Sequence, residues 1–505
     1  MPNDADTKRA QKSYSQILKS SSMVGGAQVI TMFARVVQTK FAAILIGPVG
    51  IGLIGAYQSI VELTSQFSGL GISQSAVREV AVAAGSNDKS AIECMSSILR
   101  RMCWVTGLSG TFVLATLSFH ISMLTFGNHE YFLPIIFLSA IILITAITEG
   151  KMAVIQGLRR ISDLVRIQII GSIIAVIINV SLYYSLGLSG IVPSLLAVAL
   201  INLVLSWWFA RHVLPPYQLM PWRKTFILAK DLVGLGTALM VRGLSAAFAA
   251  YLIRIFIVRY FGMAELGIYQ AAFAIPGYVL SFVLGAMVTD FYPRLAGVAD
   301  DNQKIKQIVN EQTEIGLLLA TPAVVATLGM ASLVIKILYT ADFILSVGML
   351  QWFAVGCFFR VITWPMGYIQ LAKGEKYWFM FSQIMFNVLY IFITLLSIYV
   401  IGLPGVAMAF CAVCIFHLFV IRLIAKHLAN FSWVKDTRKL IFIQVTTVSV
   451  VFAATQYFSD NWGIFIGGSV FLLNGIFGIH QILAKLGPEH RISIMINGLR
   501  KLLHL

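Results

Sequence analysis

Apolar stretches separated by short polar segments recur along almost the whole chain. About 20 consecutive apolar residues form a helix that can cross the hydrocarbon core of a bilayer. The pattern predicts fourteen such helices, at about 22–46, 51–72, 102–126, 132–150, 167–186, 189–210, 232–260, 266–290, 312–338, 346–371, 377–401, 404–421, 440–457 and 462–484. We therefore expect an all-α polytopic membrane protein.

Composition supports this interpretation and excludes a soluble domain. Hydrophobic residues make up 58% of the 505 residues and charged residues 11%, and the mean hydropathy is +0.86. The five cysteines lie in or beside apolar stretches, so a disulfide framework is not expected. Cys411 and Cys414 form a C-x-x-C within an apolar helix, without nearby acidic ligands, which favours core packing over metal or redox chemistry. No cofactor is predicted.

The net charge of +16 follows the predicted topology. With a cytoplasmic N-terminus, 30 of the 37 Lys and Arg residues fall in cytoplasmic segments, whereas opposite turns such as 47–50 and 186–190 contain none. This distribution obeys the positive-inside rule and predicts that both termini are cytoplasmic. The charge therefore does not indicate a nucleic-acid partner. The chain also has no P-loop motif, so an ATPase motor is not predicted.

Two segments of the sequence indicate an internal repeat. Phe41, Gly47 and Gly52 recur as Phe256, Gly262 and Gly267, at a constant offset of 215 residues, and Tyr-Gln pairs follow at 57–58 and 269–270. Six predicted helices separate equivalent points, so the halves are expected to be parallel repeats, as in two-lobed transporters. We expect a six-helix lobe at 1–212, a Pro-containing cytoplasmic linker at 213–230, a second lobe at 231–430, and two extra helices with a cytoplasmic tail at 431–505.

Gly50, Gly52 and Gly55 spell G-x-G-x-x-G at the first of these turns. A dinucleotide site needs a strand before this motif, and here it lies between two predicted spanning helices. Close approach of helices through small residues is the favoured interpretation.

Seven cations lie within the predicted helices. A charge at that depth costs roughly 2.5 to 3.5 kcal/mol on insertion scales, so such residues usually face a protein cavity. Arg259 and Lys336 are near enough to helix ends to snorkel. The remaining five are the candidate substrate-binding residues Arg35, Lys40, Arg242, Arg254 and Arg360.

Helical spacing places polar residues on common faces with some of these cations. Gln28, Thr31 and Arg35 share a face of the first helix, and Gln58, Glu62 and Gln66 share a face of the second. The tenth helix offers Arg360 and Thr363, and the eleventh offers Gln383, Asn387, Tyr390 and Thr394. Arg242 shares its face only with Ser245 and small residues. We expect the stripes to line a hydrated cavity between the lobes.

The balance of charge in these helices favours an anionic ligand. The five cations face chiefly Glu62 and Asp290, which could pair with a neighbouring arginine or bind a coupling ion, H⁺ or Na⁺. Polar contacts that hold helices together are the alternative for any single residue. Arginine suits phosphate because its planar fork donates two parallel hydrogen bonds. A diphosphate-linked lipid with a sugar head fits a wet, cationic cavity.

Three stretches resemble a known family: the Phe-x5-Gly-Pro-x-Gly-x-Gly turn at 41–52, the helix from Gln58 to Arg78, and Leu266 through Leu295. They are similar to the Wzx-type O-antigen and polysaccharide-repeat flippases of the multidrug/oligosaccharidyl-lipid/polysaccharide exporter superfamily. The resemblance covers roughly 20–427. It implies that an undecaprenyl-diphosphate-linked oligosaccharide crosses the bacterial inner membrane by alternating access, with membrane lipids and polysaccharide-assembly proteins as further partners.

Other functions stay open at this point. The two extra helices depart from the usual pattern of that family, and fourteen helices also occur in the related lipid II flippases. A cation-coupled multidrug exporter would be expected to carry mainly carboxylates in its cavity, whereas cations predominate here. A membrane polymerase or ligase needs a large periplasmic loop, and every predicted external turn is short, so an enzyme is not predicted.

Overall fold

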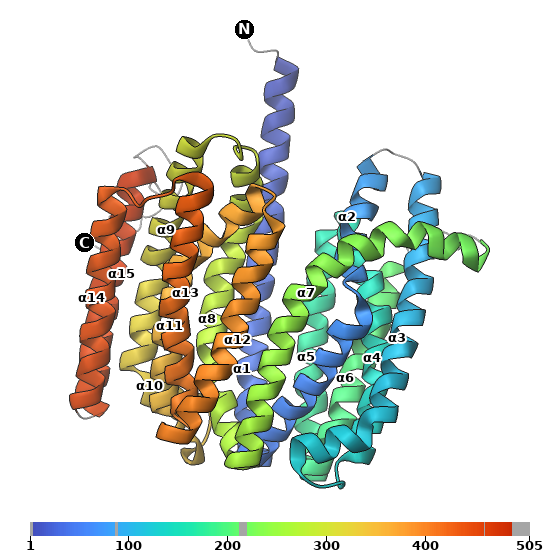
Figure 1. Ribbon diagram of the computed structural model, residues 1–505, viewed down its shortest axis with the longest axis horizontal. Helices are drawn as coiled ribbons and strands as arrows, with labels where there is room; N and C mark the ends of the chain where they lie inside the picture. The colour runs from blue at the N-terminus through green and yellow to red at the C-terminus, as the bar shows by residue number, and fades with distance from the viewer. Residues whose placement is uncertain (1–3, 86–88, 212–219, 459, 487–505) are drawn as a thin grey trace. The chain divides into compact units, whose positions relative to one another are not determined.

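The computed structural model describes residues 4–85, 89–211, 220–458 and 460–486. Within these ranges every regular element is a helix and there is no strand (Figure 1). The prediction of an all-α polytopic membrane protein is therefore confirmed. The side chains of Arg242 and Asp290, two of the candidate residues, lie outside the described part of the chain.

The chain divides into two compact units, which we call unit 1 (Met1–Gln270 with Leu338–Asp342) and unit 2 (Ala271–Ile337 with Phe343–Leu505). Unit 1 contains α1 (Asp4–Gly69), α2 (Ile72–Gly85), α3 (Lys89–Phe126), α4 (Phe132–Gly157), α5 (Ile161–Leu186), η1 (Gly187–Gly190), α6 (Ile191–Ala210), α7 (Trp222–Tyr260) and the start of α8 (Met263–Ala296). α7 begins at Trp222, so the segment 213–230, predicted as a linker, is helical from that residue onward. The predicted lobe boundaries remain a prediction.

Unit 2 is built around α9. It contains the rest of α8, then α9 (Asn302–Gly329), α10 (Ala331–Leu338), α11 (Ser346–Ala372), α12 (Lys376–Ile401), α13 (Gly405–Ala429), α14 (Lys435–Tyr457) and α15 (Asp460–Leu486), and η2 (Ala341–Phe343) lies where the chain returns from unit 1. The Asp301 carboxylate caps α9 by accepting from the backbone N–H groups of Gln303 and Lys304. α9 ends at Gly329, so the span predicted at 312–338 is two helices rather than one.

Eleven helical segments of the described chain are long and apolar enough to span a membrane. Two of them, Gly25–Gly69 and Ile161–Ala210, each cover two of the predicted spans. The span predicted at 266–290 falls in α8, and several side chains of this helix are not among those that the structure describes. The count of fourteen therefore stays a prediction.

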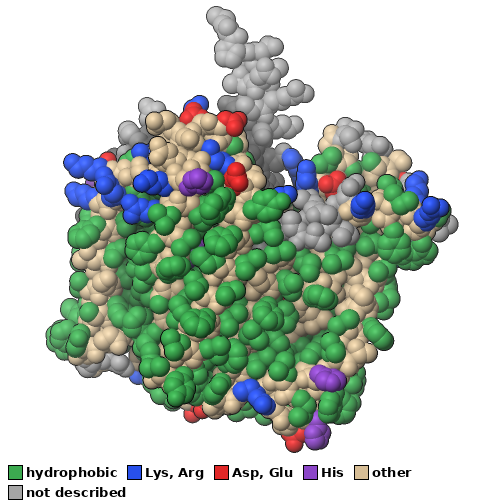
Figure 2. Space-filling model, in the orientation of Figure 1, with side chains coloured by type: hydrophobic (Ala, Val, Ile, Leu, Met, Phe, Trp, Pro, Cys, Tyr) green, Lys and Arg blue, Asp and Glu red, His purple; other side chains and the backbone are tan. Residues whose placement is uncertain are grey.

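Burial separates the core helices from those that face the surroundings. In α9, 78% of the most apolar stretch is buried within the protein, whereas in the segment from α5 to α6 only 17% is buried. The outward side chains are largely hydrophobic, and Lys and Arg gather toward one end of each unit (Figure 2). This pattern suits helices whose apolar side chains contact lipid and whose cations lie at the membrane surface.

The two repeat turns cross within unit 1. Each turn depends on a glycine with positive φ, Gly47 at 62° and Gly262 at 114°. A Cβ on Gly52 would overlap the backbone oxygen of Met263, and a Cβ on Gly267 would overlap that of Pro48. Residues 48 and 263 are related by the same 215-residue offset as 52 and 267, so the contacts are reciprocal, as a two-fold relation between the turns requires.

The last two helices pack on α9 and α11 through polar contacts. The Asn310 side chain donates to the Ser432 oxygen at 3.3 Å and accepts from the Val434 N–H at 3.0 Å, and the Thr437 hydroxyl donates to Glu314. Further along, Gln456 donates to Gln351 at 2.9 Å. α15 approaches α9 where Gly467 meets Gly329. The described part of the segment predicted as an addition, up to residue 486, therefore contributes to the core of unit 2.

Candidate functional site

Arg35 and Glu62 both lie on α1, on opposite sides of its break at Gly47. Both side chains are exposed. Neither forms an ion pair or a side-chain hydrogen bond with a described residue, so the suggested Arg35–Glu62 pair is absent from the described structure. The guanidinium of Arg35 thus remains available to a ligand.

Lys40 has a different environment, one helical turn and a half further along α1. It is half-buried, and its ammonium donates to the backbone oxygen of Tyr339, which belongs to unit 1. This contact ties α1 to the segment between α10 and α11. A structural role is therefore visible for Lys40.

Arg254 is also held by the protein. Arg254 is half-buried on α7. Its Nη1 donates to the Ala250 oxygen at 2.9 Å and its Nη2 to the Gln270 side-chain oxygen at 3.3 Å, while Nε is buried without a partner. The Gln270 side chain in turn occupies the space that a Cβ on Gly55 would need. Positions 55 and 270 are again 215 residues apart, so Arg254 braces the crossing of the two repeat turns.

The predicted polar residues of α1 are only partly available for binding. Gln58 is exposed, Gln28 and Thr31 are half-buried, and the Thr31 hydroxyl donates to the backbone oxygen of Gln28 at 3.1 Å. Gln66 packs on α7, where a Cβ on Gly243 would lie 2.5 Å from its amide oxygen. Gln66 therefore contributes to packing between α1 and α7 within unit 1.

In unit 2, Arg360 lies on α11 and is exposed. Its guanidinium lies over the Phe386 ring of α12, 5.5 Å from the ring centre, and it forms no ion pair with a described residue. Thr363, one turn away, donates to the Phe359 oxygen at 2.9 Å. Gln383 and Asn387 on α12 are half-buried.

His417 joins this group although the sequence reasoning did not select it. Its ring lies 5.1 Å from the Phe386 ring, and its Nε2 is buried without a hydrogen-bond partner. It is close enough to Arg360 for an electrostatic interaction. The available signal was an isolated histidine in an apolar helix, at Phe416-His417-Leu418. Tyr390 and Thr394, from the predicted stripe, are buried on α12.

The five candidate cations and Asp290 thus fall into three groups. Lys40 and Arg254 are bonded to main-chain or amide oxygens, Arg35 and Arg360 are exposed, and Arg242 and Asp290 lie outside the described side chains. No group of three or more His, Cys, Asp or Glu side chains in the described residues could hold a metal ion. The arrangement provides arginine groups suited to an anion.

Comparison with known proteins shows which family the chain belongs to. The family described as "Polysaccharide biosynthesis protein" matches residues 42–347. The chain belongs to this family. Among curated relatives, the lipid III flippases of Escherichia coli (strain K12) and Shigella flexneri are each 23% identical over 387 residues, which cover 74% of this chain and 90% of theirs. A sequence resemblance to polysaccharide flippases is thereby confirmed.

Solved structures of other proteins have the same fold as this chain. An inward-facing multidrug resistance MATE family transporter of the MOP superfamily has a TM-score of 0.66 at 14% identity, covering 80% of this chain and 96% of its own. The lipid II flippase MurJ, in an inward closed conformation, has a TM-score of 0.65 at 15% identity, covering 92% and 100%. The chain therefore has the fold of the MOP superfamily transporters and is a multi-pass membrane protein.

Proposed function

We propose that this protein is a flippase that moves a polyprenyl-diphosphate-linked oligosaccharide from the cytoplasmic to the periplasmic leaflet of a bacterial inner membrane by alternating access. Membership of the polysaccharide biosynthesis family supports this proposal, as does the resemblance to the lipid III flippases over 90% of their length. The positive-inside pattern supports cytoplasmic termini. In this proposal the protein carries its substrate without chemical change, and polysaccharide-assembly proteins would use the product.

The observation that carries the proposal is the environment of Arg35 and Arg360. Each is an exposed arginine on a helix long and apolar enough to span the membrane, and neither forms an ion pair with a described residue. An unpaired charge in such a helix is costly, so a ligand of opposite charge would stabilise it. A diphosphate accepts the paired hydrogen bonds that each guanidinium can donate.

The polar neighbours suit the glycan. Gln58 is exposed, and Gln28, Thr31, Gln383 and Asn387 are half-buried, so amides and a hydroxyl accompany the arginines. Such groups hydrogen-bond sugar hydroxyls. An O-antigen or related repeat unit is the proposed substrate, and Arg242 is proposed as a further phosphate ligand.

Glu62 is the proposed site for a coupling H⁺ or Na⁺, together with Asp290. Glu62 is exposed and forms no ion pair with a described residue, so its carboxylate can take up a cation. Flipping in proteoliposomes should then accelerate under an imposed pH or sodium gradient. The acceleration should be lost in Glu62→Gln, while the gradient-independent rate persists.

The test of function is transport of a fluorescent undecaprenyl-diphosphate oligosaccharide in proteoliposomes. Arg35→Gln and Arg360→Gln should each slow flipping by about tenfold or more, because each removes charge-assisted hydrogen bonds. Arg422→Gln is the matched control, since Arg422 is an exposed cation over the Trp433 ring. Wild-type rates in both variants would contradict the assigned roles. Export of a cationic dye in place of the lipid would favour a multidrug exporter.

A further inference from the structure

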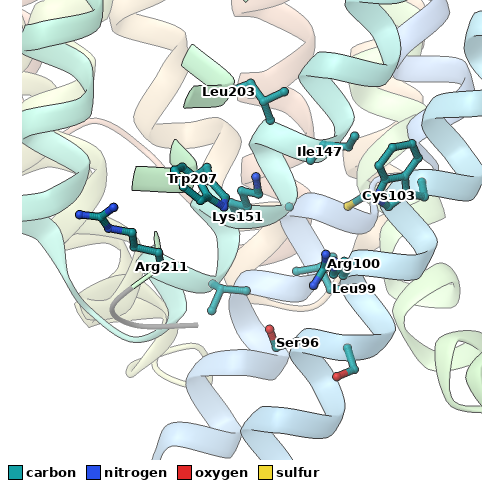
Figure 3. A pocket seen from close by; sticks show the side chains of 13 residues that line it. Ser96, Leu99, Arg100, Cys103, Ile147, Lys151, Leu203, Trp207 and Arg211 are labelled. Atoms are coloured by element: carbon teal, nitrogen blue, oxygen red, sulfur yellow. The ribbon is translucent and has the colours of Figure 1, made fainter. Parts of the chain in front are cut away.

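A cavity of about 340 Å³ lies within unit 1, between α3, α4 and α6. Its walls carry three cations from three helices: Arg100 of α3, Lys151 of α4, and Arg211 just after α6 (Figure 3). The sequence reasoning assigned these residues only to membrane topology. None of them belongs to the candidate residues above, so the cavity is a separate feature.

The electrostatics of the cavity favour an anion. No Asp or Glu is among its lining residues. Lys151 is half-buried, and it is near enough to Arg100 for the two positive charges to repel each other. The Arg211 guanidinium lies 3.5 Å from the centre of the Trp208 ring and 5.9 Å from that of Trp207, which orients it by cation–π contact. A phosphate group placed here would offset these charges.

Apart from Ser96 and Ser97, the rest of the wall is largely apolar, which distinguishes the cavity from a site for a free anion. Leu99, Ile147, Val154 and Leu203 line it, and the side chains of Trp104 and Trp207 are 44% and 50% exposed. At Gly150, a Cβ would lie 2.5 Å from the Cys103 sulfur, so α3 and α4 approach closely there. Tryptophans with exposed rings favour the level of lipid headgroups. A ligand with both a phosphate and a hydrocarbon chain matches both parts of the wall.

We propose that this cavity binds the phosphate headgroup of an anionic membrane lipid in the cytoplasmic leaflet. Lys151 and Arg211 bind the phosphate, and the apolar residues contact the first part of the lipid chain. Basic pockets between spanning helices at the cytoplasmic side are suited to such headgroups. The phosphate can belong to a resident glycerophospholipid or to a polyprenyl diphosphate. In the first case the site is independent of the proposed transport function, and in the second it loads the substrate.

The experiment measures lipid retention by the purified full-length protein, using native mass spectrometry with phosphatidylglycerol, phosphatidylcholine and undecaprenyl diphosphate as separate probes. Lys151→Gln/Arg211→Gln should weaken binding of an anionic lipid about 25-fold, because each of the two cations contributes roughly a fivefold factor near a membrane surface. Arg223→Gln/Lys224→Gln is the matched control. It removes the same charge from exposed residues of α7 that do not line the cavity.

Two further variants separate binding from misfolding. Lys151→Arg/Arg211→Lys keeps the charges and should bind as the wild type does. Leu203→Trp keeps both cations but fills the cavity, and it should lose the lipid. Loss of phosphatidylglycerol alone assigns the site to a resident phospholipid, and loss of undecaprenyl diphosphate alone assigns it to the polyprenyl lipid. Equal loss in the control double variant, or unchanged binding in both the Gln double variant and Leu203→Trp, overturns the proposal.

Discussion

Arg254 and Arg360 are both arginines within spanning helices, yet their surroundings differ. Arg254 is half-buried in unit 1 and donates to the Ala250 and Gln270 oxygens. Arg360 is exposed in unit 2, and its guanidinium contacts the face of Phe386. From the sequence, both arginines are candidate binding residues. In the structure, Arg254 contributes to packing, whereas Arg360 is accessible to a ligand. Lys40 resembles the first, and Arg35 resembles the second.

The difference teaches that the depth of a charge does not by itself identify a binding residue. A buried guanidinium whose hydrogen bonds are made inside the protein stabilises the fold. An exposed guanidinium with unused donors is costly in a membrane until a ligand arrives. The following changes test whether this distinction holds.

The largest effect is expected at the crossing that Arg254 braces. Gly52→Ala and Gly267→Ala each place a methyl group against a backbone oxygen, and the two helices must move apart. We expect a loss of about 3 kcal/mol in the free energy of unfolding, or loss of folded protein. Thermal unfolding in detergent measures this. Gly69→Ala is the control, because nothing lies within 4 Å of its new Cβ. Equal stability of all three variants would show that the crossing is not closely packed.

The second test exchanges Arg254 and Arg360 for Met in separate variants. Arg254→Met removes the donor to Gln270 beside a closely packed glycine, so we expect about 2 kcal/mol lower stability, with the transport rate per folded molecule largely retained. Arg360→Met should show the reverse, with unchanged stability and at least about tenfold slower flipping. Thermal unfolding and the flipping rate, both measured on the same preparations, show which of the two properties each variant loses. If Arg254→Met stops transport without loss of stability, the distinction is wrong.

A buried carboxylate in unit 2 tests whether a negative charge that is hydrogen-bonded inside the protein also stabilises the fold. Glu314 is buried on α9 and accepts from the Thr437 hydroxyl of α14. Thr437→Val keeps the shape of the side chain but removes this donor, so stability should fall by about 1 kcal/mol. Thermal unfolding should reveal it, with Thr447→Val as control, because the half-buried Thr447 donates only within its own helix, to the Ile443 oxygen. A larger loss in the control would mean that the contact with Glu314 is not what holds α14.

Much of this architecture could be predicted from the sequence. The apolar stretches predicted the helices, and the 215-residue offset identified the two turns, whose approach at Gly52 and Gly267 is shown only by the structure. The favoured interpretation of the G-x-G-x-x-G motif as close helix approach is confirmed at Gly52 and Gly55. These features depend on local spacing, which a sequence contains.

The partners of the charges could not be predicted in the same way. Lys40 bonds to the oxygen of Tyr339, which is distant in sequence, and no residue type at position 339 signals a backbone acceptor. The cavity of Arg100, Lys151 and Arg211 likewise depends on how three helices meet. Each of those cations lies just beyond the end of a predicted spanning segment, where the positive-inside rule explains it without a ligand. Only the packing shows that their side chains share one cavity.

The smallest effect is expected at Asp301, where a charge is bonded to the protein without being buried. Its carboxylate accepts from the Lys304 and Gln303 N–H groups and lies 3.3 Å from the Lys304 ammonium. The hydrogen bond from the Lys304 N–H, chief among these contacts, lowers the pKa of Asp301 below its usual range. The folded state therefore favours the ionised form, and this stabilisation is present above the unfolded pKa and lost as the pH falls through the folded pKa.

Asp301→Ala should consequently lower the melting temperature slightly at pH 7, and the difference from the wild type should shrink below about pH 4, where the carboxylate of the unfolded chain is protonated. Asp300→Ala removes the same charge from the adjacent exposed position, for which the structure shows no such hydrogen bonds, and it should have less effect at either pH. Unfolding followed by circular dichroism at pH 7, 5 and 3 measures both variants. If the Asp301 effect persists unchanged at pH 3, the ionised carboxylate is not the group that caps α9. Hydrogen bonds to an exposed charge would then not suffice to stabilise the fold, and the stability expected from Arg254 but not from Arg360 would depend on its burial as well as on its hydrogen bonds.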